Sequence, residues 1–221
     1  MVGVLFILNF NMKEVIMTTI SIESTGLKIQ ISDNAYKTKQ KSKQSIVQLV
    51  KRTLSPHSCG KFTKFIKHIW VDKSDNIHIE DLDDKFPFTQ FSKDIKDFLD
   101  GEYKFDKRVG SPKNLNEAMD VSMDYLKSGS MYVLFTKDFA NIMGFVKLNF
   151  SSKKNPDSIF VQLLYVKPEY RRQGIATELL EYAENLGIDK GKKKMEIGVF
   201  TKNIPALNAY LKYGFEYKDK S

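Results

Sequence analysis

Apolar and polar positions follow two spacings along the chain, and together these spacings predict a mixture of strands and helices. In residues 68–80, apolar positions alternate with polar ones on both sides of a polar stretch, which predicts a β-hairpin. In residues 89–99 and 114–127, apolar positions recur every three or four residues, which predicts two amphipathic helices. We expect the first helix to end at Gly101 and the second to be capped at its start by Asn114.

The other parts of the chain extend this mixture. Residues 18–31 predict two short strands, and the apolar stripe in residues 42–54 predicts a helix. The carboxy-terminal half shows a regular order, with strands expected at 131–136, 142–150, 159–166, 195–200 and 215–217 and helices at 174–186 and 204–213. This order predicts an α/β (α+β) domain with a mixed sheet over residues 68–221, preceded by an extension or small subdomain over residues 1–67.

The composition is that of a globular chain and excludes several kinds of site. Of the 221 residues 42% are hydrophobic, and the lone Cys59 excludes an intrachain disulfide or a multi-thiolate metal site. Three histidines are too few to indicate a metal site. No apolar run reaches the roughly 20 residues that cross a bilayer, and residues 2–10 lack the cationic start of a secretory signal. We expect a cytoplasmic protein with no membrane partner, and the sequence leaves Met1, Met12 and Met17 open as translation starts.

The formal net charge of +8 favours an anionic partner, and basic residues concentrate between residues 36 and 73. Lysines and arginines interleaved with Phe62, Phe65 and Trp70 are typical of surfaces that bind nucleic acid. However, Phe62 and Phe65 fall at helical spacing with Ile66, which favours positions in the core. Nucleic-acid binding is therefore the less favoured interpretation.

The sharpest local pattern lies where the predicted strand at 159–166 leads into the predicted helix at 174–186. The turn between them carries two arginines, a glycine and a small residue, in the order Arg171, Arg172, Gln173, Gly174, Ile175 and Ala176. The first amides of a helix have no intrahelical partner and lie at the positive end of the helix dipole, so such a turn can bind a phosphate. A basic helix start with no ligand fits the turn about equally well.

This turn and a second motif together resemble the GNAT superfamily of acyl-CoA-dependent N-acetyltransferases. The motifs are Arg171-x-x-Gly174-x-Ala176 after a strand, then Asn203-x-x-Ala206-x-x-x-Tyr210 and Tyr213-Gly214-Phe215. The match is best over residues 159–217, and a weaker match in element order reaches back to about residue 68. The resemblance implies a centrally splayed sheet flanked by helices, in a monomer or homodimer. It also implies transfer of an acetyl group from acetyl-CoA to a primary amine of a protein, peptide or small molecule, through a tetrahedral intermediate.

The resemblance implies roles for individual residues as well. The amides of residues 171–176 would hold the pyrophosphate of CoA, and the strand end from Leu164 to Val166 would pair with its pantetheine arm. Asn203 would contact the cofactor or cap the last helix, and the two roles are compatible. Tyr210 would protonate the departing thiolate, because a tyrosine with a pKa near 10 can donate to a thiolate with a pKa near 8.5. The alternative for Tyr210 is a purely structural aromatic residue in the core.

One position departs from the pattern that many members of the superfamily share. Gln162 stands on the strand where they carry a glutamate, and an amide cannot accept the proton of an attacking amine. The departure favours an acceptor amine of low pKa or a base elsewhere, for which Glu196 and Glu169 are candidates. It also leaves open a catalytically silent protein that binds CoA or another partner.

Overall fold

The computed structural model of the chain describes residues 2–3, 46–58, 60–82, 86–107, 109–128, 130–150 and 155–218. Its strands are β1 (Val2–Gly3), β2 (Ile46–Lys51), β3 (Ile66–Val71), β4 (Ile77–Ile79), β5 (Ser130–Phe135), β6 (Ile142–Asn149), β7 (Ser158–Val166), β8 (Lys194–Phe200) and β9 (Glu216–Tyr217). Its helices are α3 (Phe88–Tyr103), α4 (Leu115–Lys127), α5 (Ile175–Asp189) and α6 (Ile204–Tyr213), with short 3-10 turns η2 (Thr63–Phe65) and η3 (Pro168–Tyr170). The strands expected in residues 18–31, the alternative starts Met12 and Met17, and Cys59 lie outside the described residues.

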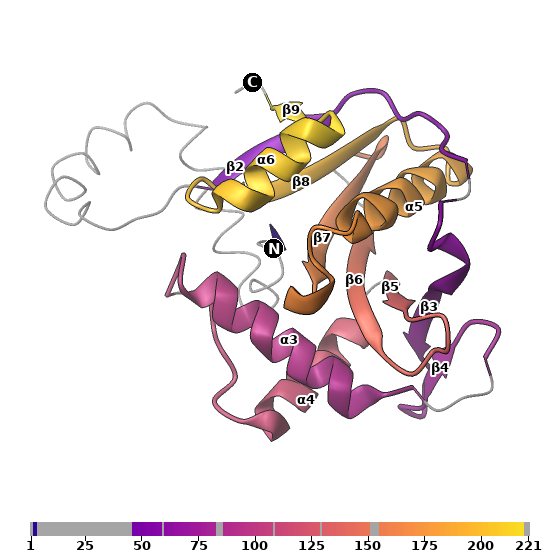
Figure 1. Cartoon of the computed structure of the whole chain (residues 1–221), viewed down its shortest axis with the longest axis vertical. Helices are drawn as coiled ribbons and strands as arrows, with labels where there is room; N and C mark the ends of the chain where they lie inside the picture. The colour runs from indigo at the N-terminus through magenta and orange to yellow at the C-terminus, as the bar shows by residue number, and fades with distance from the viewer. Residues whose placement is uncertain are drawn as a thin grey trace, which may run out of the picture.

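The described strands form one mixed sheet, as the sequence predicts. Its order is β4-β3-β5-β6-β7-β8-β2-β9, and β1 lies off this path against β7 (Figure 1). Neighbouring strands are antiparallel except β7 and β8, which run parallel. The parallel pair therefore lies between two antiparallel parts of the sheet.

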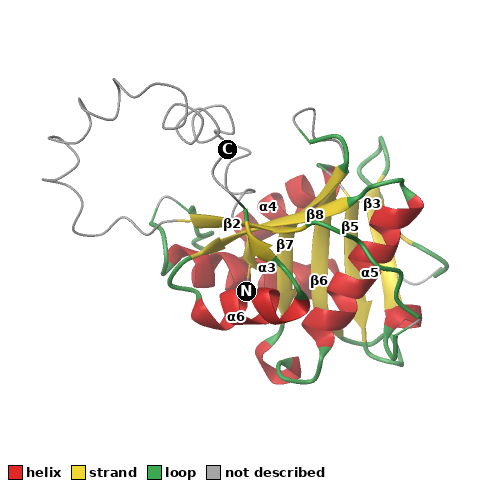
Figure 2. Ribbon diagram, turned by 90° about the horizontal axis from the view of Figure 1, so that it is seen from above, coloured by secondary structure: helices red, strands yellow, loops and turns green. Residues whose placement is uncertain are grey.

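Helices cover both faces of this sheet (Figure 2). On one face α5 and α6 pack over a core that includes Leu179, and on the other face α3 packs over a core that includes Phe98. Neighbouring residues of a strand point to opposite faces, so Val133 and Leu134 of β5 belong to different cores. The result is three layers with a sheet that is buried on both faces.

The helix predicted over residues 42–54 is wrong, because the described part of this segment contains strand β2. β2 pairs antiparallel with β8 along its six residues, from Ile46 opposite Phe200 to Lys51 opposite Met195. β-branched residues fit a pleated sheet well, and pairing with β8 overrides the helical spacing of the apolar positions.

The position of β2 also bears on the expected division of the chain at residue 67. β2 lies within the sheet between β8 and β9, and β3 runs across residue 67. A separate amino-terminal subdomain therefore remains a proposal that concerns residues before Ile46, of which the structure describes only Val2–Gly3.

The predicted hairpin is confirmed, since β3 and β4 pair with Ile69 opposite Ile79. The predicted cap of α4 is confirmed too: the backbone N–H of Glu117 donates to Asn114 Oδ1 at 3.0 Å. These elements were predictable because their signals are local to a few residues.

The expected end of α3 at Gly101 is wrong. The helix continues through Gly101, which is buried, to Tyr103. Glycine lowers helix stability by about 1 kcal/mol relative to alanine, and the packing of the apolar face of α3 against the sheet overrides that preference. The additional residues of α3 place the side chain of Glu102 in the interior of the protein.

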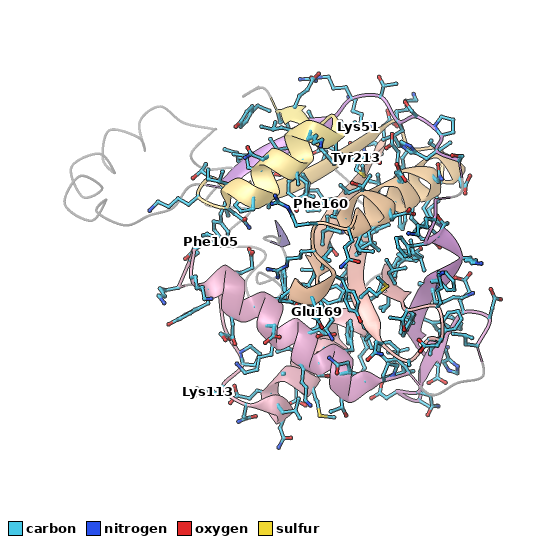
Figure 3. All side chains as sticks on the ribbon, viewed as in Figure 1. Lys51, Phe105, Lys113, Phe160, Glu169 and Tyr213 are labelled. Carbon is cyan, nitrogen blue, oxygen red and sulfur yellow. The ribbon has the colours of Figure 1, made fainter. Side chains whose placement is uncertain are left out.

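A buried carboxylate attaches the segment after β2 to α5 and α6. Glu184 of α5 is fully buried and accepts hydrogen bonds from Lys51 Nζ at 2.7 Å, from the Ser55 backbone N–H at 2.6 Å and from the Tyr213 hydroxyl at 2.8 Å. His57 Nε2 lies 2.8 Å from the same carboxylate. Burial acts to raise the pKa of Glu184, but these hydrogen bonds outweigh it and the pKa is lowered. Lys51 and Tyr213 are labelled in Figure 3, where they meet beside α6.

Two features are not found among the residues that the structure describes. None of their helices is both long and apolar enough to cross a membrane. Their histidine, aspartate and glutamate side chains do not form a group that could hold a metal ion.

We expect Asn114→Ala to lower the free energy of unfolding by about 1 kcal/mol, because the N–H of Glu117 loses its partner. In a chain of this size that change corresponds to about 2–4 °C in melting temperature, measured by circular dichroism. Asn114→Ser keeps a side-chain acceptor and should melt close to the wild type. Equal losses in the two variants would contradict the capping role.

Candidate active site

The turn between β7 and α5 has a backbone that points its amides outward. After η3, Arg172 adopts φ +63° and Gly174, the N-cap of α5, adopts φ +84°. Residues of positive φ at such a turn can direct successive N–H groups to one side, an arrangement that suits an anion. Arg172 and Gly174 are both exposed.

Beyond Arg171, whose N–H donates to the carbonyl of Pro168 at 3.3 Å, the amides of this turn have no partners within the described part of the chain. The first helical hydrogen bond runs from the N–H of Glu178 to the carbonyl of Gly174 at 3.1 Å, and no side chain caps the helix. The N–H groups of residues 172–177 donate to no described backbone carbonyl. A side chain at Gly174 would meet no atom within 4 Å, so the space in front of these amides is open.

Two polar side chains of the turn hold its shape. Arg171 Nε donates to the carbonyl of Val166 at 2.9 Å, and Gln173 Nε2 donates to the carbonyl of Glu169 at 3.0 Å. Because these side chains are engaged with the backbone, the feature of the turn that best suits an anion is its row of amides, with the exposed Arg172 beside it.

The sheet opens next to this turn. β7 and β8 pair only from Ser158–Val161 to Lys194–Ile197, although β7 continues to Val166 and β8 to Phe200. We call the unpaired ends of these two strands the splay. Leu164 and Val166, the residues expected to pair with an extended arm, lie on the β7 side of the splay.

A short strand occupies part of the splay. Val2 and Gly3 of β1 pair antiparallel with Leu164 and Leu163 of β7, and β1 also lies near β8. In Figure 1 the amino terminus lies between the two strands and α3. The edge of β7 therefore accepts an extended chain at Leu163 and Leu164, a position that overlaps the expected Leu164 to Val166 at Leu164.

The expected residues of the second motif lie on α6. Tyr210 is 1% exposed and packs on Phe215 with ring centroids 5.9 Å apart. Burial, together with the charge of Glu102, raises its pKa well above the usual value. Asn203 is the N-cap of α6, and its Oδ1 accepts from the N–H of Ala206 at 3.3 Å.

The two suggested bases do not lie in the splay. Glu196 faces Phe160 in the paired part of the sheet, about 20 Å along β7 from Val166. There it accepts hydrogen bonds from Ser158 Oγ at 2.9 Å and from Lys218 Nζ at 2.7 Å. Glu169 is exposed in η3, and hydrogen bonding from its own backbone N–H and from Lys167 lowers its pKa, which makes it a weaker base.

Gln162 lies on β7 just beyond the last residue that pairs with β8. Its side chain is buried, and its Oε1 accepts no hydrogen bond within the described residues. Gln162, which stands where many superfamily members carry a glutamate, thus places a side-chain amide with an unused acceptor oxygen where β7 and β8 begin to separate.

Glu102 was not among the functional residues predicted from the sequence. The expected end of α3 at Gly101 removed it from the predicted helix, yet its spacing of four residues from Phe98 marks the buried face. The structure brings it close enough to Tyr210 for its charge to raise the pKa of that tyrosine.

Comparison with known proteins decides the family. The model of the acetyltransferase (GNAT) family matches residues 94–215, which is more than half of the chain. The protein belongs to the GNAT family. The matched segment runs from α3 to the end of α6 and contains both the turn with free amides and Tyr210.

Several proteins that are similar to this GNAT chain are named as acetyltransferases. It is 33% identical over 57 residues to the thialysine N-epsilon-acetyltransferase of Bos taurus, covering 26% of this chain and 34% of that protein. It is 23% identical over 114 residues to an uncharacterized N-acetyltransferase of Lactobacillus delbrueckii subsp. lactis, covering 47% and 66%. A crystal structure of a GCN5-related N-acetyltransferase from Sphaerobacter thermophilus superposes with a TM-score of 0.54 at 12% identity, covering 85% and 53%. The chain thus spans about a third of the first curated relative, and the structural likeness shows the shared fold.

We expect Gly174→Glu to abolish binding of CoA, because the new carboxylate would stand in the open space before the amides and repel a phosphate. Positive φ alone costs a non-glycine residue about 1–2 kcal/mol, so a control must share it. Gly191, at φ +69° with equally open surroundings, lies beyond the other end of α5. Gly191→Glu should lose similar stability and keep its affinity in isothermal titration with CoA. Equal affinities in the two variants would exclude the amide row as the binding site.

Proposed function

We propose that the protein transfers an acetyl group from acetyl-CoA to a primary amine. The observation that carries this proposal is the row of unpaired amides in residues 172–176 directly beside the splay, in a chain of the GNAT family. Backbone amides at a helix start suit a diphosphate, and an open strand edge suits a flexible arm with amide groups. The two lie at the same end of β7, where one extended ligand can reach both.

Acetyl-CoA fits these two features as the co-substrate. Its pyrophosphate would take the amides of residues 172–176, and its pantetheine arm would pair with the edge of β7 from Leu164 to Val166. The pairing of β1 with the same edge supports this placement, because it demonstrates that Leu163 and Leu164 have backbone groups to offer. β1 and the arm exclude each other, so β1 must leave when the co-substrate binds.

The residues around the splay supply the chemistry that a thioester needs. Acetyl-CoA provides an activated carbonyl, and a backbone N–H near Val166 would stabilise the negative oxygen that forms during attack by the amine. Tyr210 would give its proton to the departing thiolate. Its raised pKa keeps it protonated until that charge appears.

A second candidate is a GNAT-fold protein that binds CoA without turnover, and Gln162 favours it. The buried amide at this position accepts no proton, so the chain lacks the carboxylate that many relatives place there. Formation of an acetylated amine from acetyl-CoA and a panel of primary amines, followed by mass spectrometry, separates the two candidates.

Binding of nucleic acid receives less support. Phe65 is 7% exposed and belongs to the core, so it is not free to stack on a base. The most basic part of the stretch, residues 36–45, lies outside the described residues.

We expect Tyr210→Phe to lower turnover about 100-fold, because the thiolate loses its proton donor, while the Kd for CoA stays within about twofold. Tyr182→Phe on α5 makes the same chemical change away from the splay and should leave both quantities unchanged. Steady-state kinetics and calorimetric titration measure the two effects separately. Parallel losses of turnover and affinity in Tyr210→Phe would make this tyrosine structural.

We also expect a chain that begins at Met17, and therefore lacks β1, to bind CoA more tightly than the full chain. Displacing one or two backbone hydrogen bonds costs about 1 kcal/mol, which corresponds to about fivefold in Kd. Titration of both chains with CoA measures the difference, with melting curves as the control for folding. An unchanged or weaker affinity in the shorter chain would contradict competition between β1 and the co-substrate.

A further inference from the structure

The last turn of α3 lies across the splay. One turn before Glu102, the ring of Phe98 contacts Tyr165 of β7, with centroids 6.2 Å apart. Three residues after it, Phe105 stacks on Phe200 of β8 at 5.7 Å. Residues four apart share one face of a helix, so Glu102 lies on the same face of α3 as Phe98, and Phe105, two residues beyond the end of α3, packs onto β8. Phe105 is labelled in Figure 3, beyond the end of α3.

Glu102 is a buried carboxylate without a partner. It is fully buried, and neither of its carboxylate oxygens accepts a hydrogen bond within the described part of the chain. A buried polar group that lacks a hydrogen bond costs about 1–3 kcal/mol, and more if it is charged. Buried titratable groups with perturbed pKa values are concentrated at functional sites, which makes Glu102 a candidate for a functional role.

The protonation of Glu102 changes in a useful range of pH. Burial raises its pKa to about 8, against the opposing charge of the amino terminus of the chain. The titratable side chains that respond to its charge are Tyr125 of α4 and Tyr210 of α6, and the pKa of each is raised mainly by burial and further by Glu102. A group with a pKa near the working pH both takes up and releases protons readily.

Glu102 and Tyr210 belong to opposite faces of the sheet. Tyr210 lies in the core under α5 and α6, whereas the neighbours of Glu102 on α3 lie in the core on the other face. In a continuous sheet a strand would separate them. The end of pairing between β7 and β8 removes that barrier, and the two side chains interact electrostatically across the splay.

We propose that Glu102 is the base that removes the proton from the acceptor amine, the task that Gln162 cannot perform. The inference rests on the proposed function and adds a second catalytic residue to it. The amine would enter from the side of α3 and approach the thioester opposite Tyr210. In this proposal the carboxylate of Glu102 on α3 takes the place of the glutamate that β7 lacks at Gln162.

Bonds and protons balance in the proposed reaction. The neutral amine forms a C–N bond with the thioester carbonyl carbon, and the π electrons move to the oxygen. Glu102 takes one proton from the nitrogen, the electron pair on the oxygen re-forms the carbonyl as the C–S bond breaks, and Tyr210 gives its proton to the sulfur. Solvent later returns a proton to Tyr210 and removes one from Glu102, so the products are the amide and the free thiol.

The electrostatic interaction between Glu102 and Tyr210 couples the two proton transfers. Burial keeps the pKa of Tyr210 high, and the charge of ionised Glu102 raises it further. When Glu102 takes the proton of the amine, that charge disappears and Tyr210 becomes a stronger acid. Proton uptake on one side of the splay thus prepares proton donation on the other.

Asp94, on the same helix, provides a matched control. It is also buried, and burial raises its pKa to about 6, but its Oδ1 accepts from Gln90 at 3.1 Å and lies 3.7 Å from Lys167 Nζ. It stands eight residues before Glu102, which is about 12 Å along the helix. Its Oδ1 therefore has partners, although its Oδ2 accepts no hydrogen bond within the described residues, and its charge is not among those that raise the pKa of Tyr210.

The experiment compares the pH dependence of kcat/KM in the wild type, Glu102→Gln and Asp94→Asn, with an acceptor amine whose pKa is near 10. In the wild type both the amine and Glu102 must lose a proton, so log kcat/KM should rise with slope two below about pH 8 and slope one above it. Glu102→Gln should show slope one throughout and about 100-fold lower kcat/KM above pH 8. Asp94→Asn should keep the break near pH 8.

Two further measurements separate this inference from a folding defect and from the proposed function. The Kd of Glu102→Gln for CoA should match the wild type, and its melting temperature should rise relative to the wild type as the pH increases from 5 to 9. The sign follows from the raised pKa of Glu102. The protonated carboxyl contributes to the stability of the folded wild type at low pH, and this contribution is lost as the pH rises through about 8. An active wild type whose Glu102→Gln variant keeps the break and the rate would overturn the inference alone. A wild type that acetylates no amine would overturn the proposed function first.

Discussion

The pairing between β7 and β8 stops at Val161 and Ile197, although both strands continue for several residues. Up to that point the sheet is continuous and buried on both faces, so a ligand has no access to its interior. Beyond it, backbone groups of β7 are available to an extended chain, and β1 uses them at Leu163 and Leu164. The same separation lets Glu102 from one layer act on Tyr210 from the other. Strand separation therefore supplies both the binding edge and the contact between the layers.

The turn that follows β7 adds the second requirement, a row of amides that suits an anion and that is fixed relative to this edge. Arg172 and Gly174 adopt positive φ, and the amides after them remain unpaired within the described residues. The hydrogen bonds of Arg171 to Val166 and of Gln173 to Glu169 fix the turn against the end of the strand. Because the turn and the edge share one strand, a ligand with a diphosphate at one end and an amide-rich arm beside it matches both.

Much of the fold and part of the site could be predicted from the sequence, and the failures have physical reasons. The hairpin at Ile69 and Ile79, the cap at Asn114 and the turn around Gly174 were predictable because a few adjacent residues determine each of them. The strand β2 was not, because its pairing with β8 joins residues about 150 positions apart and overrides a helical spacing. Glu102 was not, because Gly101 ends a helix only when packing does not extend it. The position of Glu196 at the closed end of the parallel pair also depends on strand register, which sequence alone does not specify.

The most direct test of the account is a titration of the isotopically labelled chain with CoA, followed by NMR at the backbone amides. The account predicts that the largest shifts occur at the amides of residues 172–176 and at Leu164 to Val166, since these groups would gain hydrogen bonds. Shifts confined to the basic residues of β2 and β3, or no shifts at millimolar CoA, would contradict the central claim that this turn and this strand edge form one binding site.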